Sequence, residues 1–111
     1  MRRPGYLGEF ELMVLLALIR LGENAYGVPI SREIEQRSGR EVALGSVYAA
    51  LERLEEKGLA TSTLGDPTAE RGGRAKRYFR VTEDGLRTAH DTRRVLNQLW
   101  KKLPSVGGDP A

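Results

Sequence analysis

The feature that constrains the fold most is the stretch Gly45–Lys57, GSVYAALERLEEK. Its larger apolar residues recur at intervals of four and three, which is the spacing of one helix face. Together with one alanine they form a single apolar stripe, made of Val47, Ala50, Leu51 and Leu54. Gly58 follows at the position where helices usually end. The stretch therefore predicts a short helix that packs through one side and leaves the other side exposed.

Two short strands are predicted directly after this helix. They are Leu59–Leu64 and Lys76–Val81, and the Gly-containing segment Gly65–Ala75 between them is long, carries turn signals and is expected to be mobile. On the second strand, Phe79 and Val81 share a face that we assign to the core. A helix with one buried face followed by a basic hairpin is typical of a winged helix-turn-helix. In that fold the helix enters a DNA groove and the hairpin reaches the neighbouring backbone.

Two more helices should precede this unit. Glu9–Leu21 is apolar on almost every side, so more than one neighbour should cover it. The second helix is expected from Gly27 or Val28 to Ser38, with Gly39 as its stop. The residues Glu41–Ala43 are a candidate for a very short strand. We therefore predict a winged-helix domain over residues 1–81.

A fourth helix should begin after Thr82, which is a suitable N-cap with two acidic residues behind it. Its apolar residues follow an approximate heptad seam, namely Leu86, Ala89, Leu96, Leu99, Trp100 and Leu103. A seam of this length exceeds what one small domain needs, so residues 82–103 are interpreted as a dimerisation helix. Leu12 and Leu16 of the first helix are expected to complete the interface. Residues 104–111 are expected to be a disordered tail.

The fold class predicted is therefore mainly α with a small β-hairpin, a winged helix-turn-helix plus a C-terminal dimerisation helix. With 111 residues the chain has room for one domain and a modest core. The absence of cysteine excludes disulfides, thiolate zinc sites and cysteine nucleophiles, and it fits a cytoplasmic location. The apolar run Leu12–Ile19 is too short to span a bilayer, so no membrane partner is expected.

The distribution of charge indicates double-stranded DNA as a partner. The net charge is only +3, but the segment from Arg71 to Arg80 holds several cations and no acidic residue. On a hairpin tip such cations favour phosphate contact. The candidate DNA-binding residues are Ser46, Tyr48, Ala49 and Arg53 on the helix and Arg74, Lys76 and Arg77 on the hairpin. Tyr48 either donates its hydroxyl to a phosphate or caps the edge of the core. Arg53 either contacts the DNA backbone or pairs with glutamates on its own helix.

An alternative function remains open at this point. Three acidic residues in the second half of the helix, Glu52, Glu55 and Glu56, oppose deep insertion into DNA. The chain could instead be a winged-helix protein-interaction module that never binds DNA. Catalysis has no support, because nucleophile-elbow, P-loop and dinucleotide motifs are absent. No cofactor or metal is expected, and the single histidine, His90, is interpreted as helix surface.

Trp100 is the sole tryptophan and has two interpretations. It either fills the core of the dimer or stacks on a planar small-molecule effector between the subunits. The first interpretation is favoured, since buried aromatic residues are common at interfaces.

Three stretches taken together resemble the PadR family of transcriptional regulators. They are AYGVPISREIEQRSG, GSVYAALERLEEKGLA and GGRAKRYFRVTEDG, and they cover most of residues 7–103 in order and spacing. The residues that match the family's motifs are Tyr26, Gly27, Gly45, Tyr48, Leu51, Leu54, Arg74, Lys76, Arg77, Tyr78, Arg80 and Thr82. The chain departs from the family pattern at Ala49, Ala75 and Phe79. The resemblance implies a homodimer that represses transcription by binding a palindromic operator, with release by a small lipophilic or aromatic effector in some members.

Overall fold

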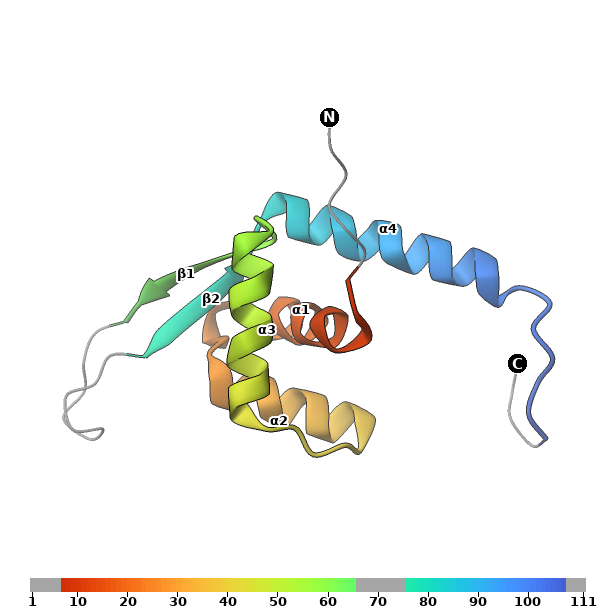
Figure 1. The fold of residues 1–111 in the computed structure, drawn as a ribbon, viewed down its shortest axis with the longest axis horizontal. Coiled ribbons are helices and arrows are strands. Elements are labelled where there is room, and N and C mark those ends of the chain that lie inside the picture. The colour runs from red at the N-terminus through yellow and green to blue at the C-terminus, as the bar shows by residue number, and fades with distance from the viewer. Residues whose placement is uncertain (1–6, 66–75, 108–111) are drawn as a thin grey trace.

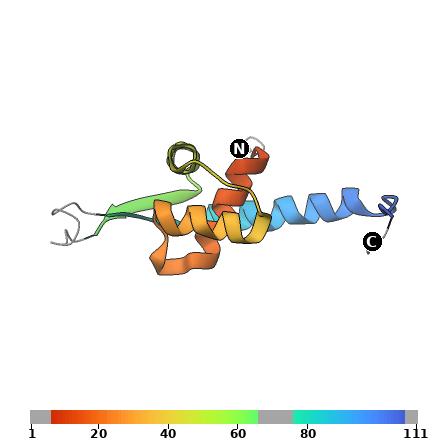
Figure 2. The ribbon, with the colours of Figure 1, turned by 90° about the horizontal axis from the view of Figure 1, so that it is seen from below.

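The computed structural model describes residues 7–65 and 76–107 of the chain. Its elements in order are α1 (Glu9–Leu21), the 3-10 turn η1 (Gly22–Asn24), α2 (Gly27–Ser38), α3 (Leu44–Glu56), β1 (Ala60–Leu64), β2 (Arg77–Val81) and α4 (Glu83–Trp100). The first three helices pack against one another at the centre, the hairpin extends to one side and α4 extends to the other (Figure 1). Turned by 90°, the molecule shows α3 end-on at one edge, near the base of the hairpin (Figure 2). The arrangement is a winged helix-turn-helix followed by a long helix.

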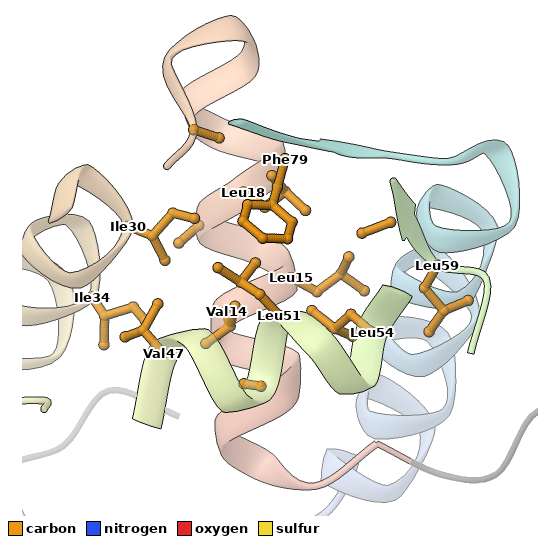
Figure 3. Packing of buried hydrophobic residues seen from close by; sticks show 14 of the residues in the cluster. Val14, Leu15, Leu18, Ile30, Ile34, Val47, Leu51, Leu54, Leu59 and Phe79 are labelled. Carbon is orange, nitrogen blue, oxygen red and sulfur yellow. The ribbon is translucent and has the colours of Figure 1, made fainter. Parts of the chain in front are cut away.

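The core lies where α1, α2, α3 and the base of the hairpin converge (Figure 3). Its largest fully buried side chains are Val14, Leu15, Leu18, Ile30, Val47, Leu51, Leu54 and Leu59. The apolar stripe predicted on α3 is confirmed, because all four of its residues are completely buried. Burying this stripe against α1 and α2 fixes which side of α3 remains at the surface.

The turn between α2 and α3 differs slightly from the prediction. Gly39 ends α2 in the left-handed conformation, with φ of 75°, as expected of a helix stop. The short strand predicted at Glu41–Ala43 is wrong. The backbone N–H of Val42 instead donates to the Glu35 carboxylate at 3.1 Å, so a side chain rather than a strand accepts this hydrogen bond. α3 begins at Leu44, one residue earlier than predicted, and has no side-chain cap.

The hairpin is antiparallel, and Ser62 pairs with Phe79 in its register. Each strand begins one residue later than predicted. Phe79 is buried, as predicted, and Val81 packs against the same core. The N–H of Phe79 donates to the carbonyl of Ala25 at 2.8 Å, which ties β2 to the segment that leads into α2. The connecting loop expected to be mobile lies almost entirely outside the described residues.

α4 begins as predicted at the Thr82 cap. The Thr82 hydroxyl accepts a hydrogen bond from Gly85 N–H at 2.9 Å and donates to the carbonyl of Gly58 at 2.7 Å. The start of α4 is therefore fastened to the turn that ends α3. The helix stops at Trp100, three residues before its predicted end, because Lys101 is extended and Lys102 is left-handed, with φ of 64°. Residues 104–107 form neither helix nor strand, and the rest of the predicted tail lies outside the described residues. Within residues 7–65 and 76–107, no helix is both long and apolar enough to cross a membrane.

Candidate nucleic-acid interface

The exposed side of α3 is the centre of the candidate interface. Leu44, Gly45 and Ser46 are exposed in its first turn, while Tyr48 and Ala49 are half-buried at the margin. Further along, Glu52, Arg53 and Glu56 are exposed as well. The helix is held to the body by its opposite side, so its first two turns present Leu44 and several small or polar groups to the solvent.

Tyr48 packs across the start of α2. A Cβ atom on Gly27 would overlap the Tyr48 ring and lie 2.5 Å from the hydroxyl oxygen, so only glycine permits this approach. The N-cap of α2, Tyr26, gives no side-chain hydrogen bond to the helix end. Tyr48 therefore supports the helix-turn-helix through its ring while its hydroxyl lies beside the positive end of α2.

A second aromatic contact brings the hairpin to the same place. The Nζ of Lys76 lies 4.6 Å from the centre of the Tyr26 ring and donates to the Tyr26 hydroxyl at 3.4 Å. Tyr26 also meets Tyr78 edge-on, with ring centres 5.3 Å apart. We call Tyr26, Lys76 and Tyr78 the tyrosine–lysine cluster. Tyr26 is not among the predicted DNA-binding residues, although it matches a motif of the family that the sequence resembles.

Arg77 is hydrogen-bonded to neighbouring side chains at the surface, where its own side chain is 42% exposed. Its guanidinium donates to the Glu55 carboxylate at 2.9 Å and to the Ser62 hydroxyl at 3.0 Å, and Ser62 donates to the same carboxylate at 2.8 Å. The guanidinium also lies 5.2 Å from the centre of the Phe79 ring. These contacts join both strands to α3, so Arg77 braces the hairpin against the helix. Arg74 lies outside the described residues.

Of the two roles considered for Arg53, DNA contact and pairing with glutamates on its own helix, the structure bears on the second. Arg53 donates to Glu11 of α1 at 2.5 Å, and Lys57 donates to the other oxygen of the same carboxylate at 2.7 Å. The expectation of pairing within its own helix is therefore wrong. The hydrogen bond from Lys57, followed by that from Arg53, holds the pKa of Glu11 below its ordinary value, although burial of the carboxylate opposes this effect.

A second bridging carboxylate lies on α2. Glu33 accepts hydrogen bonds from Arg20 of α1 at 2.7 Å and from Arg37 at 2.9 Å. The bond from Arg20, and then that from Arg37, lowers the pKa of Glu33. The ion pair between Arg20 and Glu33 therefore joins α1 to α2 and does not involve α3.

Most of the residues predicted for a dimer interface line a groove between α1 and α4, whereas Leu99 and Leu103 lie outside its lining. The groove has a volume of about 410 Å³, and its lining includes Leu12, Leu16, Leu86, Leu96 and Trp100. Leu99 and Trp100 are strongly exposed, at 72% and 65%. Ala89 differs from the others, because it is buried in the chain's own core. Leu103 is exposed but lies beyond the end of α4.

Metal binding finds no support in the described part of the chain. There, no three histidine, cysteine, aspartate or glutamate side chains gather closely enough to hold an ion.

Comparison with known proteins places these features in a family. Residues 15–91 match the sequence profile of the transcriptional regulator PadR-like family. Among curated proteins, none matches the chain in sequence.

Solved structures share the fold. The hsRosR-S1 complex structure is 27% identical, with 86% of this chain and 79% of that chain covered and a TM-score of 0.66. A transcriptional regulator from Clostridium thermocellum is 24% identical, with coverage of 82% and 85% and a TM-score of 0.68. A PadR family regulator from Eggerthella lenta is 23% identical, with coverage of 82% and 79% and a TM-score of 0.65. Because the family profile spans more than half of the sequence and includes α2, α3 and the hairpin, the chain belongs to the PadR-like family of transcriptional regulators.

Proposed function

We propose that this regulator is a repressor that binds a palindromic DNA operator as a homodimer. The observation that carries the proposal is the placement of α3. Its whole apolar stripe is used to pack the body, and its first two turns are exposed beside the tyrosine–lysine cluster. A helix held in this way can enter the major groove while neighbouring groups contact the phosphates.

The proposed DNA contacts divide into two kinds. Ser46 and Ala49 on α3 face the base edges, where a hydroxyl can bond to several bases and a methyl group can contact thymine. Tyr48 and Lys76 supply phosphate contacts, the first through its hydroxyl beside the positive end of α2. We assign Arg74 to the phosphates as well, from the sequence alone. Base contacts give specificity, and phosphate contacts give affinity that falls with salt.

The homodimer is proposed from the apolar groove. Leucine side chains and a tryptophan are exposed along one side of α4 and on α1, and a second copy of the chain would cover them. Paired helix-turn-helix units place their half-sites about 10 base pairs apart, centre to centre. A palindromic operator with this spacing follows from a twofold dimer.

A small-molecule effector is proposed at the same groove. Trp100 lines it and is mostly exposed in the single chain, so a planar aromatic or lipophilic molecule could stack on the indole ring. Titration of the protein with a panel of planar aromatic compounds should quench Trp100 fluorescence for at least one compound. No response across a broad panel would remove the effector from the proposal.

DNA binding is tested by equilibrium binding with two labelled duplexes. One duplex carries the region upstream of the protein's own gene, and the other is a scrambled sequence of the same length and composition. Fluorescence anisotropy at low and physiological salt should show tighter binding to the upstream duplex, with the difference preserved as salt rises. Absence of binding to both duplexes at low salt would favour the alternative, a winged-helix module that binds only protein.

A further inference from the structure

We propose that Glu11 is a positioning residue that withholds Arg53 and Lys57 from DNA and thereby confines DNA contact to the first two turns of α3. The inference rests on the DNA binding proposed above. It concerns two cations at the C-terminal end of α3, and it assigns to them a role within the chain.

The geometry of the three side chains supports this role. Glu11 lies on α1, and its two carboxylate oxygens each accept one hydrogen bond, from Arg53 at 2.5 Å and from Lys57 at 2.7 Å. The Glu11 side chain is only 12% exposed, whereas Arg53 and Lys57 are 49% and 31% exposed. The carboxylate is thus the least exposed of the three groups, and both cations point toward it on α1.

No other acidic residue in the described chain shares these cations. Glu55 is engaged with Arg77 and Ser62, while Glu52 and Glu56 are exposed on α3. If Arg53 turned toward a phosphate, Glu11 would keep a charge in a mostly buried position with one partner fewer. Removing a partner from a carboxylate that is mostly shielded from solvent opposes such an exchange. Arg53 therefore gains little by leaving Glu11 for DNA.

The consequence is an electrostatic boundary along α3. With Arg53 and Lys57 neutralised in part by Glu11, and with Glu55 paired to Arg77, the exposed charges on the second half of the helix are those of Glu52 and Glu56. Like charge keeps this half away from the phosphates. The first two turns remain the part of α3 that can approach base edges, so Glu11 favours specific over non-specific binding.

The test measures how binding of the scrambled duplex depends on salt. The salt slope is the change in the logarithm of the binding constant with the logarithm of the salt concentration. If Glu11→Gln releases one cation to contact a phosphate, we expect the slope to steepen by about one unit. Binding at 0.1 M salt should then tighten by roughly five- to tenfold. Discrimination between the upstream and scrambled duplexes should fall. Arg53→Gln and Lys57→Gln in the wild-type background should leave the slope unchanged, since neither cation is free to contact DNA.

Two controls separate this effect from altered folding or charge. The triple variant Glu11→Gln, Arg53→Gln, Lys57→Gln should return the slope to the wild-type value. Glu9→Gln removes the same charge from the same helix but from an exposed pair with Arg40, and it should change neither slope nor discrimination. Circular dichroism of each variant checks that the total helix content is that of the wild type.

Several outcomes would overturn the inference. An unchanged slope for Glu11→Gln, a lower slope for Arg53→Gln alone, or a steep slope that persists in the triple variant would each contradict it. Loss of helical signal in Glu11→Gln makes Glu11 a folding residue and also overturns the assignment. Failure of the wild-type protein to bind either duplex would instead reject the proposed function itself.

Discussion

Two glycines in the first turns of helices meet different surroundings. A Cβ atom on Gly85 of α4 would overlap the carbonyl oxygen of Leu59 and lie 2.8 Å from a methyl group of Val81. A Cβ atom on Gly45 of α3 would meet nothing within 4 Å. The same substitution should therefore have opposite effects at the two sites.

We expect Gly85→Ala to lower the free energy of unfolding by roughly 2 kcal/mol, because backbone must move to make room. Gly45→Ala should raise it by up to about 1 kcal/mol, since alanine favours the helix. Urea unfolding followed by circular dichroism measures both changes. Equal effects for the two variants would show that α4 does not approach the α3–β1 turn as closely as described.

Glu11 also predicts how stability depends on pH. Its pKa in the folded chain is lowered from an ordinary value of 4.5 by Lys57 and Arg53, so folding favours the ionised form. The contribution of Glu11 is therefore fully present above pH 4.5 and is lost as the pH falls through the lower, folded pKa. The difference in unfolding free energy between the wild type and Glu11→Gln should be large at pH 7 and should shrink in acid. A difference that stays constant down to pH 3 would contradict this role.

At the scale of elements, the hairpin carries two neighbouring cations with different expected roles. Lys76 belongs to the tyrosine–lysine cluster, whereas Arg77 is bonded to Glu55 of α3. We expect Lys76→Ala to weaken DNA binding for all sequences and to reduce the salt slope by about one unit. Arg77→Ala should instead lower stability by up to about 1 kcal/mol, as partly exposed ion pairs do.

Anisotropy titrations and thermal unfolding of both variants distinguish the two roles. Glu55→Ala is the matched control for Arg77, because it breaks the same ion pair from the other side. A slope that falls for Arg77→Ala but not for Lys76→Ala would reverse the assignment.

The elements themselves were largely predictable because their signals are local. The stripe of α3, the stop at Gly39 and the cap at Thr82 each depend on residues within one or two turns, and the structure confirms all three. The end of α4 was predicted wrongly, since Leu103 continues the seam although the backbone leaves the helix after Trp100.

The contacts of the candidate interface were harder to predict. Glu11 and Arg53 are 42 residues apart, and Tyr26 and Lys76 are 50 apart, so no spacing in the sequence connects them. Only the packing of α1 against α3, and of β2 against η1 and the residues that follow it, brings these groups together. The residue types were sufficient to identify the candidate DNA-binding cations, but they did not predict which side chains those cations contact within the chain.

At the scale of the whole molecule, the chain is more extended than its length requires. The radius of gyration is 16.1 Å, against roughly 13 Å for a compact chain of this size. The hairpin and α4 leave the body on opposite sides (Figure 1). The second half of α4 consequently has little of its own chain to pack on, which agrees with the proposed partner subunit.

A substitution at Leu99 tests the proposed homodimer most simply. Leu99 is 72% exposed, so Leu99→Lys should leave the folded single chain intact while placing a charge in the proposed interface. Analytical ultracentrifugation should show a shift from dimer to monomer. Val106→Lys is the matched control, because Val106 is equally exposed but lies beyond α4, and it should leave the dimer unchanged. Identical behaviour of the two variants would place the interface elsewhere.

The most direct test of the account is the mass of the complex formed with the upstream duplex. Mass photometry or light scattering counts the chains bound to each DNA molecule. Two helix-turn-helix units joined along α4 predict two chains per duplex at saturation, and one or none for Leu99→Lys at the same concentration. A wild-type complex with a single chain per duplex, or no complex at low salt, would contradict the claim that paired α3 helices bind one operator.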